Sequence, residues 1–297
     1  MWKDQEASVC APSLTDYEYA ECFNAFKQAC SEWGSMEQWL SEDFLVRPSW
    51  AGPLDVLSVG SGTGDFDLKI MRHLINRWRV NAYVAIDPNT SHNQVFMNKF
   101  QESGLKVKGF QLLAETFPCE GLSRRFDFVH LTHCLYYIPD RVQAIQAAVE
   151  SLKDEGYLII FHQTPLGVNE IQRRFLKQAK GHVNEMFSSR DIYRLLKELS
   201  LPFTFEIVDG ILNVSDCLVP DSPKGKKLIN FFLECRADCL PEEFRGRALD
   251  FIQELAFEDG GHPVIFHPVG VFCVRKKSLT KESRVPFNSL TMRHAKT

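Results

Sequence analysis

The chain has 297 residues, of which 44% are hydrophobic and 24% charged, and its formal net charge is −4. This composition is typical of a globular protein, and the mild acidity argues against the basic face that nucleic acids or anionic membranes require. No stretch resembles a signal peptide or a membrane span, and the nine scattered cysteines form no C-x-x-C pair. We therefore predict a monomeric, cytoplasmic protein with reduced cysteines and no nucleic-acid or membrane partner.

The N-terminal region is predicted to contain a flexible arm at 1–14 and then an apolar helical stripe. The stripe has the three- and four-residue spacing of one helix face and consists of Tyr19, Cys22, Phe23, Phe26 and Cys30. The pattern changes near residue 32, where a second helix is expected. A turn-rich segment at 48–53, with two prolines and a glycine, marks the next boundary.

Strands and helices alternate in the middle of the chain. Mostly apolar strands, as expected when both faces of a sheet are covered, are predicted at 54–59, 80–86, 107–113, 126–131 and 156–162. Helical patterns lie between them, at 65–77, 89–102 and 139–153. This alternation predicts an α/β fold with a Rossmann-like, doubly wound parallel sheet and right-handed crossovers.

The pattern is looser in the second half of the chain. Helices are expected at 168–179, 188–199, 226–236 and 241–257, and strands at 203–209 and 269–274. The two late strands would complete a seven-stranded sheet. The long insert between them, which starts with a polar connection at 211–227, is expected to help cover a substrate.

These elements predict one domain at 15–275, followed by a basic, polar and disordered tail at 276–297. The domain is expected to consist of an N-terminal helical cap at 15–50, a cofactor-binding half at 51–163 and a substrate-covering half at 164–275.

Three alternating glycines follow the first predicted strand. Gly60, Ser61, Gly62 and Gly64 would form a loop in which a ligand approaches bare backbone at a helix N-terminus. Asp65 stands where a dinucleotide fingerprint has its third glycine. Because an acid at a helix start repels a pyrophosphate but suits an ammonium group, the motif favours S-adenosylmethionine over NAD. An NAD-dependent dehydrogenase remains the alternative at the level of the fold.

Further cofactor ligands are expected at the ends of the next strands. Asp87 lies where an acid can accept hydrogen bonds from a ribose diol, with a helix N-cap as the alternative. Gln94 either reaches the same ligand or faces solvent. Glu115 and Thr116 either border the adenine ring or belong to a solvated loop, and Thr132 ends the fourth strand beside the same crevice.

His133, Tyr136 and Tyr137 follow the fourth strand directly. Aromatic rings attract a cation, and an imidazole can accept a hydrogen bond or a proton, so this segment suits an amine substrate. The alternative is that the tyrosines only pack against the following helix. The chain has no Walker sequence, no Ser-His-Asp arrangement and no metal-ligand spacing, so no metal is predicted.

With these residues the chain resembles the histamine N-methyltransferase family of class I methyltransferases, over roughly residues 15–275. The similarity is carried by the segments at 19–23, 57–68, 126–137 and 214–217. The resemblance implies S-adenosylmethionine as the cofactor and an amine as the acceptor.

The resemblance also implies an acceptor site. Glu32 matches a glutamate that binds the amine in the family, although a glutamate at a helix end is more often solvated. Tyr19 and Phe23 would enclose the acceptor together with the two tyrosines, and His267 is a weaker candidate on the far wall.

The chain departs from the family at this acceptor site. His133 stands where the family has a glutamine, and the asparagine of the family falls on or next to Pro268, with His267 adjacent. Aromatic pocket residues are replaced around Val168 and Gln172. Because an imidazole and an amide differ in donors, acceptors and charge, the resemblance does not decide whether histamine is the substrate.

We therefore predict an S-adenosylmethionine-dependent N-methyltransferase of a small amine or imidazole-containing metabolite. Glu32 and His133 would position and deprotonate the nucleophile. A hydroxyl, thiol or carboxylate acceptor and a non-catalytic binding protein of the same fold are the alternatives.

Overall fold

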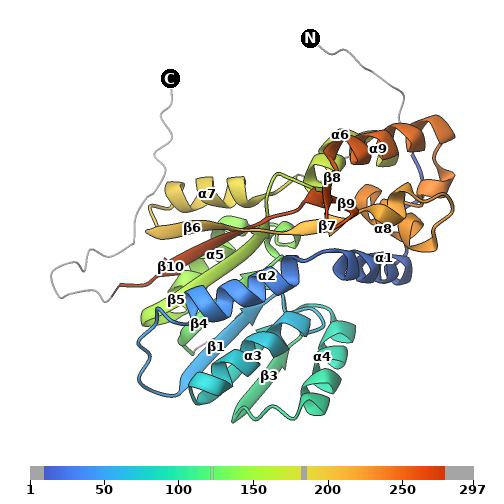
Figure 1. The fold of residues 1–297 in the computed structure, drawn as a ribbon. Helices are drawn as coiled ribbons and strands as arrows, with labels where there is room; N and C mark the ends of the chain where they lie inside the picture. The colour runs from blue at the N-terminus through green and yellow to red at the C-terminus, as the bar shows by residue number, and fades with distance from the viewer. Residues whose placement is uncertain (1–9, 121, 123, 182–185, 278–297) are drawn as a thin grey trace, which may run out of the picture.

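A computed structural model describes residues 10–120, 122, 124–181 and 186–277, and at its centre lies a seven-stranded sheet (Figure 1). The strand order is β3-β2-β1-β4-β5-β10-β6. The strands are β1 (Leu54–Val59), β2 (Val80–Ile86), β3 (Gly109–Leu113), β4 (Phe126–Thr132), β5 (Leu152–Gln163), β6 (Phe203–Val208) and β10 (Val269–Arg275). The first five are parallel, whereas β10 is antiparallel to both β5 and β6. The predicted Rossmann-like fold is confirmed, with a mixed rather than a purely parallel sheet.

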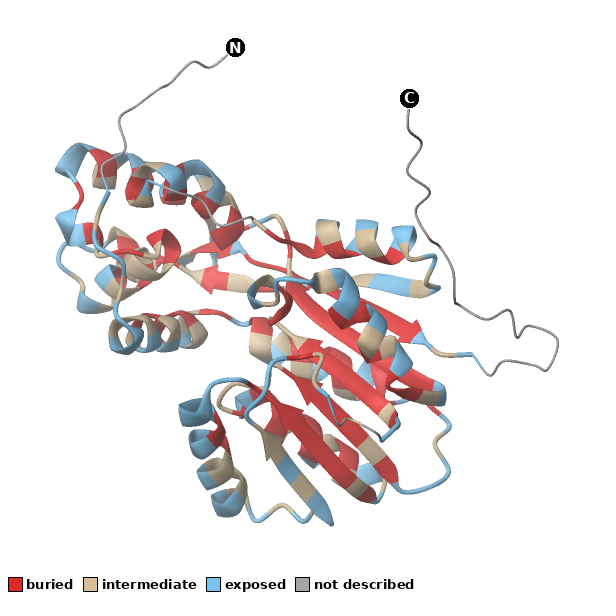
Figure 2. Ribbon diagram, turned by 180° about the vertical axis from the view of Figure 1, so that it is seen from behind, coloured by how far each residue is buried: buried red, intermediate tan, exposed pale blue. Residues whose placement is uncertain are grey.

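Helices cover both faces of this sheet, and burial is concentrated in its central strands (Figure 2). The first layer is formed by α2 (Glu32–Gln38), which continues into a π-helical turn (Trp39–Phe44), and by α3 (Asp65–Arg77) and α4 (Thr90–Ser103). The second layer is formed by α5 (Arg141–Glu150) and α7 (Ser189–Glu198). Because neighbouring residues of a strand point to opposite faces, Val56 packs against the first layer and Leu57 against the second.

A third cluster lies beyond the carboxyl ends of the parallel strands (Figure 1). Its helices are α1 (Asp16–Ala29), α6 (Val168–Lys180), α8 (Pro223–Leu233) and α9 (Glu242–Leu255). They pack around a small sheet of order β7-β9-β8, with β7 (Ile211–Asn213), β8 (Phe257–Asp259) and β9 (His262–Phe266). This cluster stands over the edge of the large sheet where the candidate site residues lie.

The small sheet was not predicted from the sequence. β7 lies inside the segment expected to be a polar connection, and β8 and β9 form a hairpin whose turn is Gly260-Gly261, with φ of +57° and +79°. A Gly-Gly pair between short strands is a hairpin signal, because both turn residues need a positive φ. The signal was present in the sequence, but the strands on either side are too short to show an alternating pattern.

The structure describes part of the predicted N-terminal arm and very little of the predicted C-terminal tail. The described part of the predicted arm is bound to the domain rather than loose: Ala11 N–H donates to Ala179 O at 2.8 Å, and Arg236 N–H donates to Pro12 O at 2.9 Å. Residues 1–9 and 278–297, which include nearly all of the predicted tail, lie outside the described residues.

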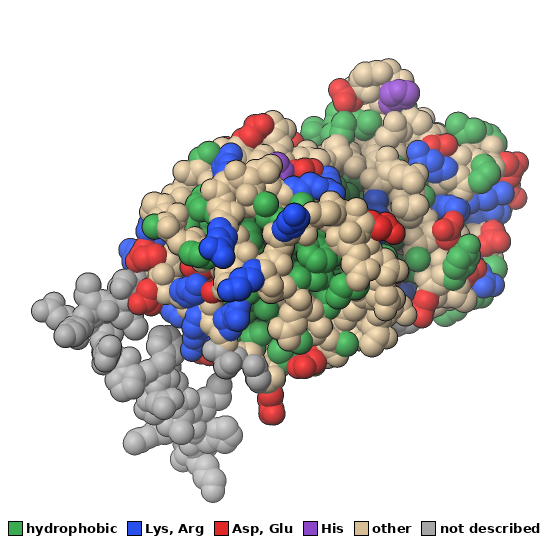
Figure 3. Space-filling model, turned by 90° about the horizontal axis from the view of Figure 1, so that it is seen from below, with side chains coloured by type: hydrophobic (Ala, Val, Ile, Leu, Met, Phe, Trp, Pro, Cys, Tyr) green, Lys and Arg blue, Asp and Glu red, His purple; other side chains and the backbone are tan. Residues whose placement is uncertain are grey.

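No described helix is long and apolar enough to span a membrane. On the face seen in Figure 3, acidic and basic side chains both lie beside exposed apolar ones.

A polar cluster is buried between the first helical layer and the sheet. The Tyr83 hydroxyl donates to Asp67 Oδ1 at 2.9 Å and lies 3.0 Å from His130 Nε2. Burial raises the pKa of Asp67 to about 6 and lowers the pKa of His130 to about 3. Because Asp67 binds its proton more tightly in the folded than in the unfolded state, its contribution to the free energy of unfolding falls as the pH rises through this range.

We expect Asp67→Asn to remove this pH dependence. The free energy of unfolding of the variant, relative to the wild type, should therefore rise by about 3 kcal/mol between roughly pH 4 and pH 6 and then stay level. Urea unfolding at several pH values measures this difference. Asp43→Asn, at an exposed aspartate, is the control, and an equal slope in both variants would contradict the assignment.

Candidate active site

The glycine loop after β1 has the backbone geometry that only glycine adopts without strain. Gly60, Gly62 and Gly64 have φ of +69°, +53° and +74°. A Cβ atom on Gly60 would lie 2.3 Å from Cβ of Cys134, and one on Gly64 would lie 2.1 Å from the ring of Phe96. The loop therefore turns in a space that admits no side chain at two of its three glycines.

Asp87, at the end of β2, is 8% exposed and holds this loop in place. Its Oδ2 accepts from Gly62 N–H at 2.9 Å, and its Oδ1 accepts from Asn89 N–H at 2.9 Å. The N-cap of α4 is Asn89, whose side chain accepts from Ser91 N–H and His92 N–H, so the N-cap alternative for Asp87 is wrong. Each carboxylate oxygen keeps a lone pair with which it can accept from a ribose hydroxyl.

Asp65 does not have the role that the sequence suggested. Its carboxylate accepts from Lys27 Nζ at 2.8 Å and forms a second ion pair with Lys99. Two lysines neutralise the acid, so the argument that its charge repels a pyrophosphate does not hold. Asp65 instead connects α1, the start of α3 and α4 beside the glycine loop.

The remaining predicted cofactor residues differ in position. Gln94 is exposed and donates to Asn98 Oδ1 at 3.0 Å, which fits the solvent-facing alternative. Glu115 and Thr116 are exposed and follow β3, next to the strand end that carries Asp87. Thr132 is half-buried at the end of β4. Glu115, Thr116 and Thr132 thus lie at the edge of the large sheet where neighbouring parallel strands end.

Glu32 is the most unusual residue of the candidate acceptor site. It is the first residue of α2, and it is only 2% exposed, so the solvated alternative for this glutamate is wrong. Its Oε2 lies 3.4 Å from His267 Nε2 and 3.8 Å from His133 Nε2. Among the described residues, neither Oε2 nor His133 Nε2 has a hydrogen-bond partner, although both are buried. Burial raises the pKa of Glu32 to about 8.

Both histidines are oriented by the backbone. His267 Nδ1 accepts from Val168 N–H at 3.4 Å, which leaves Nε2 facing Glu32. The backbone of His133 has a φ of +49°, and its backbone N–H donates to Phe161 O at 2.9 Å. Burial lowers the pKa of His267 to about 4 and holds the pKa of His133 well below its ordinary value. Both imidazoles are therefore neutral at physiological pH.

Aromatic side chains from two segments meet beside this group. The hydroxyls of Tyr19 and Tyr137 lie 3.1 Å apart, and the ring of Phe23 stacks on Tyr19 with centroids 6.2 Å apart. The ring of Tyr136 lies 4.5 Å from that of Tyr137, which is 69% exposed. The structure therefore brings together all four predicted aromatic residues, and Tyr137 marks the side that is open to solvent.

Sequence reasoning missed three residues at this site. The ring of Trp33 lies 5.6 Å from that of His133, and its Nε1 is buried without a partner in the described part of the chain. His162, near the carboxyl end of β5, lies 5.0 Å from Tyr136. Cys30 converges with Glu32 and His267. A polar residue at the end of a buried strand is a recognisable signal, so His162 could have been found.

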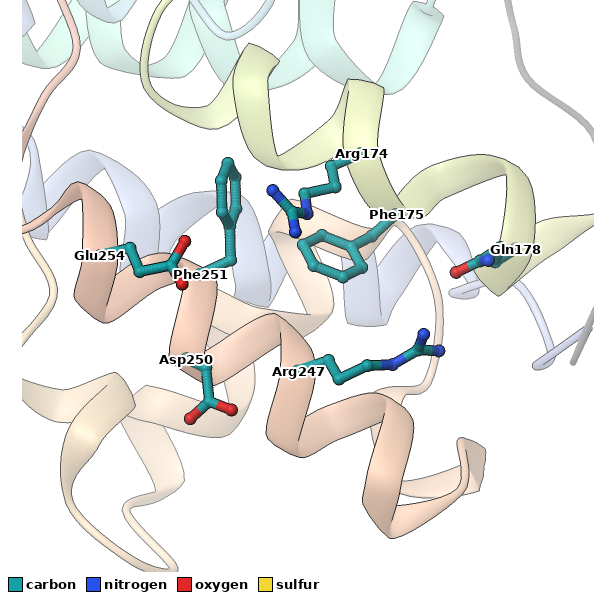
Figure 4. A pocket seen from close by; sticks show the side chains of 7 residues that line it. All are labelled: Arg174, Phe175, Gln178, Arg247, Asp250, Phe251 and Glu254. Carbon is teal, nitrogen blue, oxygen red and sulfur yellow. The ribbon is translucent and has the colours of Figure 1, made fainter. Parts of the chain in front are cut away.

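A separate surface cleft lies between α6 and α9, with a volume of about 370 Å³ (Figure 4). It is lined by Arg174, Phe175, Gln178, Arg247, Asp250, Phe251 and Glu254. None of the predicted site residues lines it, so it is distinct from the candidate active site.

The strand order, the glycine turn after β1 and the buried acid after β2 define a class I methyltransferase. Residues 38–201, more than half of the chain, match the family described as a methyltransferase domain. The chain belongs to this family and is an S-adenosylmethionine-dependent methyltransferase, which decides against the NAD alternative.

The curated relatives confirm the predicted resemblance. Histamine N-methyltransferase A of Xenopus laevis is 23% identical over 245 residues, which cover 74% of this chain and 81% of that protein. Carnosine N-methyltransferase 2 of Gallus gallus is 24% identical over 240 residues, which cover 74% and 73%. A solved structure, the plantazolicin methyltransferase BpumL with SAH and a triazolic analogue, is 11% identical with a TM-score of 0.51, over 88% and 92% of the two chains. At that identity the similarity shows the fold alone.

Proposed function

We propose that this methyltransferase transfers its methyl group to a nitrogen of a small amine or imidazole-containing metabolite. The observation that supports this most is a pair of buried atoms, Glu32 Oε2 and His133 Nε2, which lie 3.8 Å apart beside the aromatic wall and have no hydrogen-bond partner among the described residues. A buried carboxylate without a partner is costly unless a cationic or hydrogen-bonding ligand satisfies it. The names of the two relatives, both N-methyltransferases, support a nitrogen acceptor.

The chemistry follows from these groups. The bound cofactor supplies a methyl group that is already activated on a sulfonium. In its ionised form Glu32 would accept the proton from the acceptor nitrogen, whose freed lone pair would then attack the methyl group and displace the demethylated cofactor. His133, a neutral imidazole, orients the acceptor. Holding the two reactants in line can contribute on the order of 7–11 kcal/mol at best.

The cofactor would lie on the glycine loop in this proposal. The backbone at Gly60, Gly62 and Gly64 admits close approach, and Asp87 would accept hydrogen bonds from the ribose hydroxyls. The hydroxyl of Ser61 is buried and has no partner among the described residues, which suits a ligand at this loop. Glu115, Thr116 and Thr132 would border the rest of the cofactor.

We also propose that the enzyme is cytoplasmic. None of the nine cysteines, all of which lie within the described ranges, forms a disulfide, which suits a reducing compartment such as the cytoplasm. We keep the prediction of a monomer with one catalytic domain at 15–275, in which the third cluster covers the acceptor.

Transfer of a labelled methyl group to a panel of small amines and imidazoles tests this function, with calorimetry of cofactor binding beside it. We expect cofactor binding and a labelled nitrogen on at least one acceptor. Labelled product only on hydroxyls, thiols or carboxylates would overturn the nitrogen assignment. Cofactor binding without product on any acceptor would favour a non-catalytic role.

A further inference from the structure

Three potential metal ligands converge where α1 meets α2. Cys30 ends α1, Glu32 begins α2, and His267 lies just before β10. All three are buried, and their ligand atoms lie within 4.8 Å of one another. The closest measured pair, Glu32 Oε2 and His267 Nε2, is separated by 3.4 Å. Two segments that are far apart in the chain, one at 30–32 and one at 267, thus present a sulfur, an oxygen and a nitrogen to one point.

Contacts from outside the cluster hold two of its three residues. His267 Nδ1 accepts from Val168 N–H, so Nε2 faces inward and carries the ring proton. Cys30 is held by a β-bridge to Leu212 in the small sheet. Glu32 Oε2 points into the cluster and lacks a hydrogen-bond partner in the described ranges. The cluster is therefore held at Cys30 and His267, and Glu32 Oε2 has no hydrogen-bond partner among the described residues.

The donor set indicates which ion would bind. Thiolate, imidazole and carboxylate together are the ligands of zinc, at bond lengths of about 2.3, 2.0–2.1 and 2.0–2.2 Å. In a tetrahedral site these lengths place the ligand atoms about 3.3–3.6 Å apart. The 3.4 Å between Glu32 Oε2 and His267 Nε2 already matches, and the 4.8 Å limit on the other separations requires shifts of about 1 Å at most. His133 Nε2 lies 3.8 Å from the same carboxylate oxygen.

We propose that Cys30, Glu32 and His267 bind a Zn²⁺ ion, and that this ion competes with the amine acceptor for Glu32. Binding releases the protons of the Cys30 thiol and the Glu32 carboxyl to solvent. It also moves the Nε2 proton of His267 to Nδ1, which then gives up the hydrogen bond from Val168 N–H. The thiol distinguishes this metal site from an amine site, because a soft sulfur donor contributes little to the binding of an ammonium group. The competition rests on the proposed function, whereas the metal site itself does not.

Metal binding is tested first, on the full chain. Zinc should bind at one ion per protein, and Co²⁺ titrated into metal-free protein should give a sulfur-to-cobalt charge-transfer band. Cys30→Ser should abolish the band and weaken zinc binding by about tenfold or more. Cys22→Ser, a change at another buried cysteine of α1, is the matched control and should leave the band unchanged.

His267→Gln is the second variant, which keeps the inference testable if Cys30→Ser does not fold. It should weaken zinc binding while the charge-transfer band remains at saturating Co²⁺. A band that persists in Cys30→Ser, or a zinc content well below one ion per protein, would overturn the site.

The competition is tested by kinetics with an accepted amine. Zinc should raise KM for the amine and leave KM for the cofactor unchanged. An enzyme that binds zinc but methylates no amine would refute the proposed function and leave the metal site standing. An enzyme that methylates amines but gives no cobalt band would refute the metal site alone.

Discussion

Glu32→Gln should lower kcat/KM for the amine acceptor by about 10²–10⁴, the contribution typical of a positioned general base. Glutamine keeps the shape of the side chain but can neither carry the negative charge nor accept the proton from the nitrogen. The cofactor should bind as in the wild type, because Glu32 lies on the acceptor side. Initial rates at varied acceptor concentration measure the loss, and calorimetry with the cofactor shows that the glycine loop is intact.

The pH profile separates a base from a merely structural glutamate. With a pKa of about 8 from burial, Glu32 is protonated below this pH and ionised above it. Because the ionised form is the base, kcat/KM should rise up to about pH 8 and then level off. His267, whose pKa is lowered to about 4, is neutral throughout this range and contributes no step.

The same acceptor must be used for both proteins, since the acceptor's own deprotonation also raises the rate with pH. The part of the rise in kcat/KM that the Glu32→Gln variant lacks is then due to the ionisation of Glu32. Glu37→Gln is the matched control: Glu37 lies on the same helix but pairs with Lys69 and His73 at 2.6 and 3.1 Å. Equal kcat/KM values in both variants, or an unchanged profile in Glu32→Gln, would contradict the assignment.

The cofactor half of the chain was predictable because its signals are local. A strand, a glycine turn and a helix start follow one another within a few residues, and the periodicity of each element is visible in the sequence. Asp87 could be placed for the same reason, since parallel strands end at one edge of a sheet.

The local sequence could not predict the electrostatics of the glycine loop. The two lysines that neutralise Asp65 come from α1 and α4, one before the loop and one after it. A charge is interpretable only together with its neighbours in space, and the sequence showed the acid alone. The preference for S-adenosylmethionine was correct, but the reason first given for it was not.

The acceptor half depends on distant contacts. Glu32 and His267 are more than 200 residues apart and meet only because β7 pairs with β9 and holds the α1–α2 junction against it. No spacing within one segment reveals such a cluster, so a search for metal-ligand motifs found none. The resemblance to a family indicated Glu32, but Cys30 became visible only in the structure.

Gly64→Ala should destabilise the protein by about 2–5 kcal/mol and weaken cofactor binding. Alanine at a φ of +74° is strained by about 1–2 kcal/mol. Its Cβ would also lie 2.1 Å from Cδ2 of Phe96, a fully buried ring, and overpacking of this kind costs about 1–3 kcal/mol. Because the ring is fixed in the core, the loop must move instead, and the backbone that faces the cofactor moves with it. Urea unfolding and calorimetric titration measure the two effects.

Gly62→Ala separates strain from crowding. Its φ of +53° imposes a similar backbone strain, but a Cβ there would meet no described atom within 4 Å. We expect it to cost only the first of the two contributions, about 1–2 kcal/mol. In the Gly64→Ala background, Phe96→Leu should recover stability, although alone it leaves a cavity. A double-mutant cycle with no coupling between positions 64 and 96 would show that Phe96 yields to the methyl group. In that case only backbone strain would require glycine at this turn.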